Sequence, residues 1–243
     1  MRTTARITAF LTGAVLLTTA ACSGDSGTGH AKGAKKDDVA SSVSGHQQGS
    51  TGADAGPAKT LGKKRLDQVV IEGTVAGYKV SKLADRDIPL DGGYSVNRKE
   101  CAPIGALIGG HLPVKPAGEV YRTVRPVDAK NATVGNVWLS AYGSEQAGRV
   151  VDTLGTAVDM CKGSFTTAGL TYHSVERIGP ARPGEVAFRV TGDVGKQQIT
   201  MNYRVVRAGT VVAGFYGVNM LHPKDGTISD AVVDAQLERL SNG

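Results

Sequence analysis

The stretch "EVAFRVTGDVGKQQITMNYRVVRAGTVVAGF", residues 185–215, decides the fold class of this chain. Apolar and polar residues alternate along it, and the segments "GDVGK" and "RAG" interrupt the alternation with residues that favour turns. A period of two is typical of half-buried strands, so the stretch predicts two successive hairpins that form an antiparallel meander. We expect one apolar face, formed by Val186, Phe188, Val190, Ile199, Met201, Tyr203, Val205, Val211, Ala213 and Phe215.

Helical patterns lie before and after this meander. Ser144 is expected to cap a helix with one apolar stripe, which ends near Gly163, and residues 227–240 predict an amphipathic final helix. "GKKRLDQVVIEG" (62–73) and "CAPIGALIGG" (101–110) each predict a short helix.

Three further segments between these helices read as strands. They are "TVAGYKVSKLA" (74–84), "EVYRTVRPV" (119–127) and "TVGNVWLSAYG" (133–143). A half-buried sheet combined with one-sided helices predicts a two-layer α+β domain over residues 61–243, with an antiparallel sheet packed on one face by several helices.

The N-terminus has the pattern of an export signal. Arg2 and Arg6 precede an uncharged apolar segment, residues 7–21, which is too short for a membrane helix but suits a secretory signal. Small residues then precede Cys22, and this block resembles the lipobox of bacterial lipoproteins. The resemblance implies that residues 1–21 are a lipoprotein signal peptide and that Cys22 carries the lipid, palmitate included. The alternatives are an ordinary signal peptide with a chance cysteine, or an uncleaved anchor.

Residues 22–60 have a composition that does not favour folding. Gly, Ser, Ala, Thr and charged residues dominate, and Val39 and Val43 are the only large aliphatic side chains. So little apolar surface cannot offset the entropy of ordering, so we expect a disordered polar tether between the lipidated Cys22 and the domain.

The two remaining cysteines suggest a disulfide. With Cys22 used for the lipid, Cys101 and Cys161 form an even pair in an oxidising exported compartment. The alternatives are two free thiols or a metal site, but no CxxC motif and no nearby histidine pattern supports zinc. A bridge requires Cα atoms about 4.4–6.8 Å apart.

Motifs of the common catalytic classes are absent from the sequence. It contains no SxxK, GxSxG, HExxH or CxxC, so we predict no enzyme, no cofactor and no metal site. The net charge of +6 includes Arg2 and Arg6, and the only basic run is "KKR" at 63–65, so nucleic acid is not an expected partner. Trp138 reads as a core residue, and His111, His173 and His222 read as surface or core histidines.

The order of these segments is similar to a known group of cell-surface domains. "VIEGTVAGYKV", one cysteine before an apolar helix, "VWLSAYGSEQAGRVVDTLGTAVDMC", and "EVAFRV…YRVVRAGTVVAGF" together resemble sensor-like domains of actinobacterial lipoproteins. They resemble also the external domain of PknH-type receptor Ser/Thr kinases. The resemblance implies a non-catalytic sensor-like or ligand-binding module, anchored to the cell membrane on its extracytoplasmic face.

Two functional classes therefore remain open. The first is a binding module with a cleft for a small molecule or lipid, whose ligand-binding residues the sequence does not identify. The second is a structural or interaction lipoprotein that docks an envelope protein and has no small-molecule ligand. A cleft with convergent polar groups favours the first, and an exposed apolar patch outside any cleft favours the second.

Overall fold

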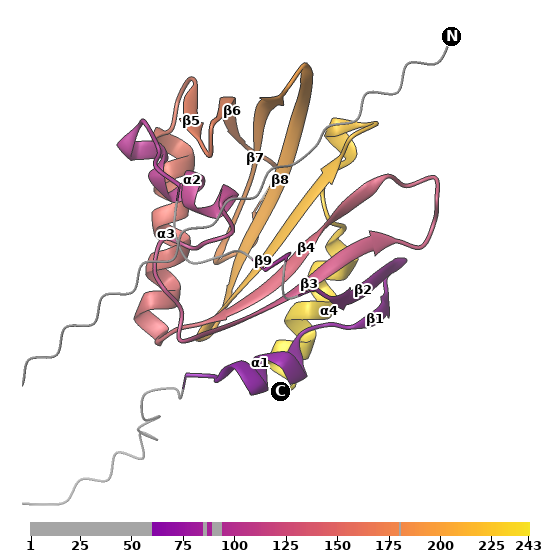
Figure 1. The fold of residues 1–243 in the computed structure, drawn as a ribbon. Coiled ribbons are helices and arrows are strands. Elements are labelled where there is room, and N and C mark those ends of the chain that lie inside the picture. Colours follow the sequence, from indigo (N-terminus) through magenta and orange to yellow (C-terminus); the bar gives the residue numbers. More distant parts are fainter. Residues whose placement is uncertain (1–59, 85–86, 89–93, 180) are drawn as a thin grey trace, which may run out of the picture. The chain divides into compact units, whose positions relative to one another are not determined.

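A nine-stranded antiparallel sheet organises the computed structural model, which describes residues 60–84, 87–88, 94–179 and 181–243 (Figure 1). The described residues belong to one unit of the chain, residues 53–243. The expected signal peptide, the lipidated Cys22 and the tether up to residue 59 lie outside the described residues. Among those described, no helix is both long and apolar enough to cross a membrane.

The sheet consists of two meanders that join at their last strands. Its order is β1-β2-β3-β4-β9-β8-β7-β6-β5, and β4 pairs with β9 along its whole length. The first meander comprises β1 (Gly73–Val75), β2 (Tyr78–Lys82), β3 (Gly118–Pro126) and β4 (Thr133–Ala141). The second comprises β5 (Phe165–Thr167), β6 (Leu170–Arg177), β7 (Glu185–Val194), β8 (Gln197–Ala208) and β9 (Val211–Asn219).

The hairpins predicted from residues 185–215 are confirmed as β7–β8 and β8–β9. Gly195 and Gly209 adopt positive φ in their turns, a conformation that costs a residue without Cβ little. β7 and β8 pair over ten residues, from Glu185–Val206 to Val194–Gln197.

Two short hairpins were not predicted. The single strand expected over residues 74–84 is interrupted at Ala76 and Gly77, which both have positive φ and turn β1 back onto β2. Ala168 and Gly169 form the corresponding turn between β5 and β6. Two consecutive residues with positive φ form the turn that matches strand twist, but alanine rarely occupies it, so the sequence gives little indication of either hairpin.

In the described part of the chain, four α-helices pack against the sheet: α1 (Lys63–Val69), α2 (Ala102–Ile108), α3 (Ser144–Met160) and α4 (Asp230–Ser241). The α+β class, the antiparallel sheet and its packed helices are as predicted. The N-cap of α3 is Gly143 rather than the expected Ser144, and no side chain caps this helix. Two single-turn 3-10 helices, η2 (Lys99–Cys101) and η3 (Pro223–Asp225), precede α2 and α4.

The helices cover both faces of the sheet, whereas they were predicted to pack on one face. Val205 and Val212 pack with α2 and α3, and their chain neighbours Val206 and Ala213 pack with α1 and α4. The register explains the difference, because Val206 pairs with Ala213 and Arg204 with Phe215. Val211, Ala213 and Phe215 therefore face α4, not the side of Val205 as expected. The central strands are apolar on both sides, which makes three layers.

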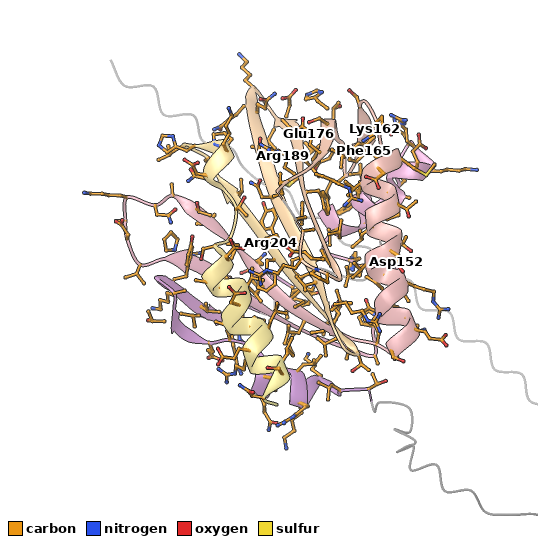
Figure 2. The ribbon with its side chains drawn as sticks, turned by 180° about the vertical axis from the view of Figure 1, so that it is seen from behind. Asp152, Lys162, Phe165, Glu176, Arg189 and Arg204 are labelled. Carbon is orange, nitrogen blue, oxygen red and sulfur yellow. A yellow bond between two sulfur atoms is a disulfide. The ribbon has the colours of Figure 1, made fainter. Side chains whose placement is uncertain are left out.

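The face covered by α4 also carries ion pairs. Arg204, on β8, donates to the buried Glu185 at 2.6 Å and to Asp230 at the start of α4 at 2.5 Å. Figure 2 shows Arg204 beside α4, with Arg189 and Glu176 farther along β7 and β6. Arg204 therefore links the N-terminal end of α4 to the middle of the sheet.

The predicted disulfide is confirmed. Cys101 and Cys161 are bonded, their Cα atoms are 4.9 Å apart, and both residues are fully buried. Cys101 immediately precedes α2, and Cys161 follows the last residue of α3. The bond therefore fixes α2, a seven-residue helix with a glycine in its interior, to the longest helix of the domain.

Candidate functional site: an aromatic cleft under helix α2

A cleft of about 320 Å³ lies on the α2 face of the sheet, beyond the area that α3 covers. This volume is within the range of small-molecule sites and about twice that of a cavity that holds benzene. We call it the aromatic cleft. Its floor is formed by side chains from β3, β4, β8 and β9: Tyr121, Asn136, Trp138, Met201, Tyr203 and Tyr216.

Strand register brings the floor residues together from distant parts of the chain. Tyr203 pairs with Tyr216, and Tyr216 pairs with Asn136, so these three form one row across β8, β9 and β4. In the next row Tyr121 lies opposite Trp138. Residues opposite one another in a ladder project from the same face, so both rows line the cleft.

Gly214 determines how Trp138 lies on the floor. The two residues are opposite each other on β9 and β4, and a Cβ on Gly214 would lie 2.0 Å from two atoms of the indole ring. The indole therefore lies flat across the bare backbone of β9. Trp138 is largely buried, as predicted for a core residue, but one side of it also lines the cleft, which was not predicted.

The end of helix α2, Leu107 and Ile108, and the turn after it, Gly109 and Gly110, form one wall of the cleft. Gly105 allows the helix to approach its neighbours closely, since a Cβ at this position would lie only 2.3 Å from the Val96 side chain. The disulfide holds the start of the same helix. Glycine and the disulfide thus set the position of this wall, and Leu83, Asp87 and Tyr94 line the remainder of the cleft.

Two tyrosines of the floor, Tyr203 and Tyr216, have their rings in contact and remain protonated. The ring centroids of Tyr203 and Tyr216 are 5.2 Å apart, and Phe188 stacks on Tyr203 at 5.3 Å. Burial raises the pKa of Tyr203 well above its ordinary value and also raises the pKa of Tyr216. At neutral pH these phenols are therefore hydrogen-bond donors and apolar surface, not phenolate nucleophiles.

Two polar groups on the floor are available to a ligand. The Tyr203 hydroxyl donates to the sulfur of Met201 at 3.7 Å, and the Tyr121 hydroxyl donates to Glu119 at 3.0 Å. The amide of Asn136 and the hydroxyl of Tyr216 have no hydrogen-bond partner among the described side chains and backbone groups. Because these two residues are cross-strand neighbours, both groups can contact one ligand.

The histidines singled out in the sequence do not gather at this floor. His173 contacts Asp193 at 2.6 Å on β6 and β7, and His222 follows β9. His111 lies beside the cleft, in the neighbouring cavity described below. Within the described ranges, no three residues among His, Cys, Asp and Glu are placed to bind a metal ion together.

No protein-family model matches the chain, and no curated protein matches it. Among solved structures it is similar to the crystal structure of the extracellular domain of PknH from Mycobacterium tuberculosis. The TM-score is 0.46 and the sequence identity 10%, over 76% of this chain and 99% of that chain. That structural neighbour is the domain named in the sequence resemblance, while membership of the lipoprotein group stays a prediction.

Proposed function

We propose that this chain is an extracytoplasmic lipoprotein, anchored by a lipid on Cys22, that binds a small apolar ligand in the aromatic cleft without catalysis. The observation that carries the proposal is the pairing of an aromatic floor with the available Asn136 amide and Tyr216 hydroxyl. An apolar pocket with a few convergent polar groups is the usual form of a small-molecule site. The function would be that of a sensor or carrier at the membrane surface.

The chemistry of the floor side chains is the reason that we propose a non-catalytic role. The titratable groups of the floor are tyrosines, of which Tyr203 and Tyr216 have raised pKa values, and the floor has no histidine, cysteine or lysine. A general base near neutral pH therefore has no candidate on the floor. Asp87 and Tyr94 lie at the rim and are exposed to solvent.

Ligand binding can be followed through Trp138, the only tryptophan in the chain. We would titrate the exported chain carrying Cys22→Ala with N-phenyl-1-naphthylamine, an uncharged aromatic probe, and measure energy transfer from Trp138. Saturable transfer is expected. Asn136→Phe should abolish it by filling the floor, whereas the matched change Asn242→Phe, at the exposed end of α4, should not.

The anchoring half of the proposal has a separate test. Acylation requires the Cys22 thiol, so cells that express the chain should incorporate labelled palmitate into it, and Cys22→Ala should remove the label. Palmitate that remained on the variant would contradict the lipoprotein assignment. Absence of probe binding in a stably folded chain would instead favour the alternative, a lipoprotein that docks an envelope protein.

A further inference from the structure

A second cavity, of about 660 Å³, adjoins the aromatic cleft. Leu83 and Tyr121 line both cavities. The second cavity lies where β2 ends, because Lys82 is the last residue paired with β3, opposite Arg122. Among the described residues, no strand pairs with this edge of β3 before Arg122. We call this cavity the edge notch and define it by Lys63, Lys64, Asp67, Lys82, Glu119 and Arg122.

The edge notch connects the two faces of the sheet. Tyr121 projects toward the aromatic cleft, while its neighbours Val120 and Arg122 project toward α1. Successive side chains of a strand point to opposite faces, so a molecule at this edge can contact both. A ligand that extends past Tyr121 out of the cleft therefore enters the notch.

The notch carries an excess of positive charge. Four of its defining residues are cationic and two are carboxylates. Asp67 is already paired with Arg122 at 2.7 Å and with Lys82 at 3.3 Å, which lowers the pKa of Asp67 and keeps it ionised. Glu119 accepts hydrogen bonds from Tyr121 and from Ser140.

Two of the cations are left without an anion. Lys63 and Lys64 are exposed and form no ion pair with any described residue. Arg122 is fully buried and shared between Asp67 and Glu72, so its guanidinium fixes the floor of the notch and is not free for a ligand. The charge available to an incoming anion therefore comes from the lysines around the rim.

We infer that the ligand is an amphiphile with an anionic head, whose apolar chain fills the aromatic cleft and whose phosphate or carboxylate lies in the edge notch. This inference rests on the proposed function and names the class of its ligand. The aromatic floor supplies apolar contact for the chain, and Lys63, Lys64 and Lys82 supply the charge complementarity for the head. Glu119 opposes the same head and limits its affinity.

The test compares three probes in the exported chain carrying Cys22→Ala, with Trp138 fluorescence as the readout. Decyl phosphate has the chain and the head, decanol has the chain alone, and inorganic phosphate has the head alone. We expect decyl phosphate to bind about tenfold more tightly than decanol, and inorganic phosphate to bind far more weakly than either. High salt should reduce the difference in affinity between decyl phosphate and decanol, because the lysines are exposed.

Variants locate the head. Lys63→Gln, Lys64→Gln and Lys82→Gln together should weaken decyl phosphate about tenfold and leave decanol unchanged, since each exposed charge contributes up to about fivefold. Glu119→Gln should tighten decyl phosphate about twofold to threefold. Lys79→Gln is the matched control, because Lys79 is an exposed lysine on the same strand that does not line the notch.

The outcomes separate the inference from the function on which it rests. Equal affinities for decyl phosphate and decanol, or loss of affinity in Lys79→Gln equal to that in the triple variant, would overturn the anionic-head assignment and leave the cleft as a binding site. Inorganic phosphate that bound as tightly as decyl phosphate would make the notch an independent anion site and overturn it too. Failure of all three probes, with N-phenyl-1-naphthylamine also unbound, would remove the proposed function itself.

Discussion

Gly214→Ala tests the packing on which the aromatic cleft depends. The new Cβ would lie 2.0 Å from two indole atoms of Trp138 and 2.6 Å from a third, where ordinary contact begins at 3.4 Å. The indole must therefore move by about 1.4 Å away from β9. Because Trp138 lies on the floor of the cleft, this displacement fills the space that a ligand would use.

The expected loss of stability follows from overpacking of the core. Extra carbon atoms forced into a packed core destabilise by about 1–3 kcal/mol, and a domain of this size loses about 2–4 °C of Tm per kcal/mol. We therefore expect Tm to fall by about 2–12 °C. Trp138 emission should shift to the red as the indole moves toward solvent, and binding of N-phenyl-1-naphthylamine should be lost.

The assay combines thermal unfolding with fluorescence and includes two controls. Gly155→Ala in α3 places its Cβ in ordinary contact, 3.7 Å from the nearest atom, and should stabilise the helix by about 0.5–1 kcal/mol. Trp138→Phe removes the outer part of the indole, so Gly214→Ala should cost clearly less in that background. A Gly214→Ala chain with unchanged Tm and emission would refute this account of the floor.

Three further predictions concern stability. Gln236 is fully buried on α4, accepts from the Ile71 amide at 2.9 Å and donates to the Val69 carbonyl at 3.0 Å, so Gln236→Ala should cost about 2–4 kcal/mol in urea unfolding and exposed Gln68→Ala almost nothing. Reduction of the Cys101–Cys161 bond should cost about 2–5 kcal/mol and loosen α2, so that amide exchange rises there before it rises in β8; uniform exchange would contradict this. Arg204 lowers the pKa of Asp230, so ionised Asp230 stabilises the fold above the ordinary carboxyl pKa, and this contribution is lost as the pH falls through the lowered value. Asp230→Asn should therefore flatten the acid limb of the curve of stability against pH, by less than about 1 kcal/mol because Asp230 is largely exposed. An unchanged acid limb would remove that linkage.

Local patterns predicted much of the fold. The long strands β7, β8 and β9 follow from alternation bounded by glycine turns, and α3 follows from its apolar stripe, because both signals lie within one element. The disulfide followed from cysteine parity and export. Each of these inferences needed no knowledge of which elements are neighbours in space.

The two-sided burial of the sheet was not predictable in the same way. Val206 and Ala213 look like ordinary members of an alternating strand, and only the pairing of β8 with β9 assigns them to the α4 face. The short strands β5 and β6 were missed because their turn uses Ala168 at positive φ and their residues are mostly polar. Local sequence does not encode which helix will cover a face.

The candidate site was missed for the same reason. Asn136, Tyr203 and Tyr216 are far apart in sequence and meet only through the pairing of β4 with β9 and β9 with β8. Trp138 was correctly read as a core residue, but its second role as part of the floor depends on Gly214, a residue on another strand. The available signal was the placement of these aromatic residues in alternating strands.

A crystal structure of the exported chain with decyl phosphate tests the central claim most directly. We predict continuous density for the alkyl chain against Trp138 and Tyr216, with the phosphate in the edge notch near Lys63 and Lys64. An aromatic cleft without ligand density at saturating decyl phosphate, or density confined to another part of the surface, would contradict the account.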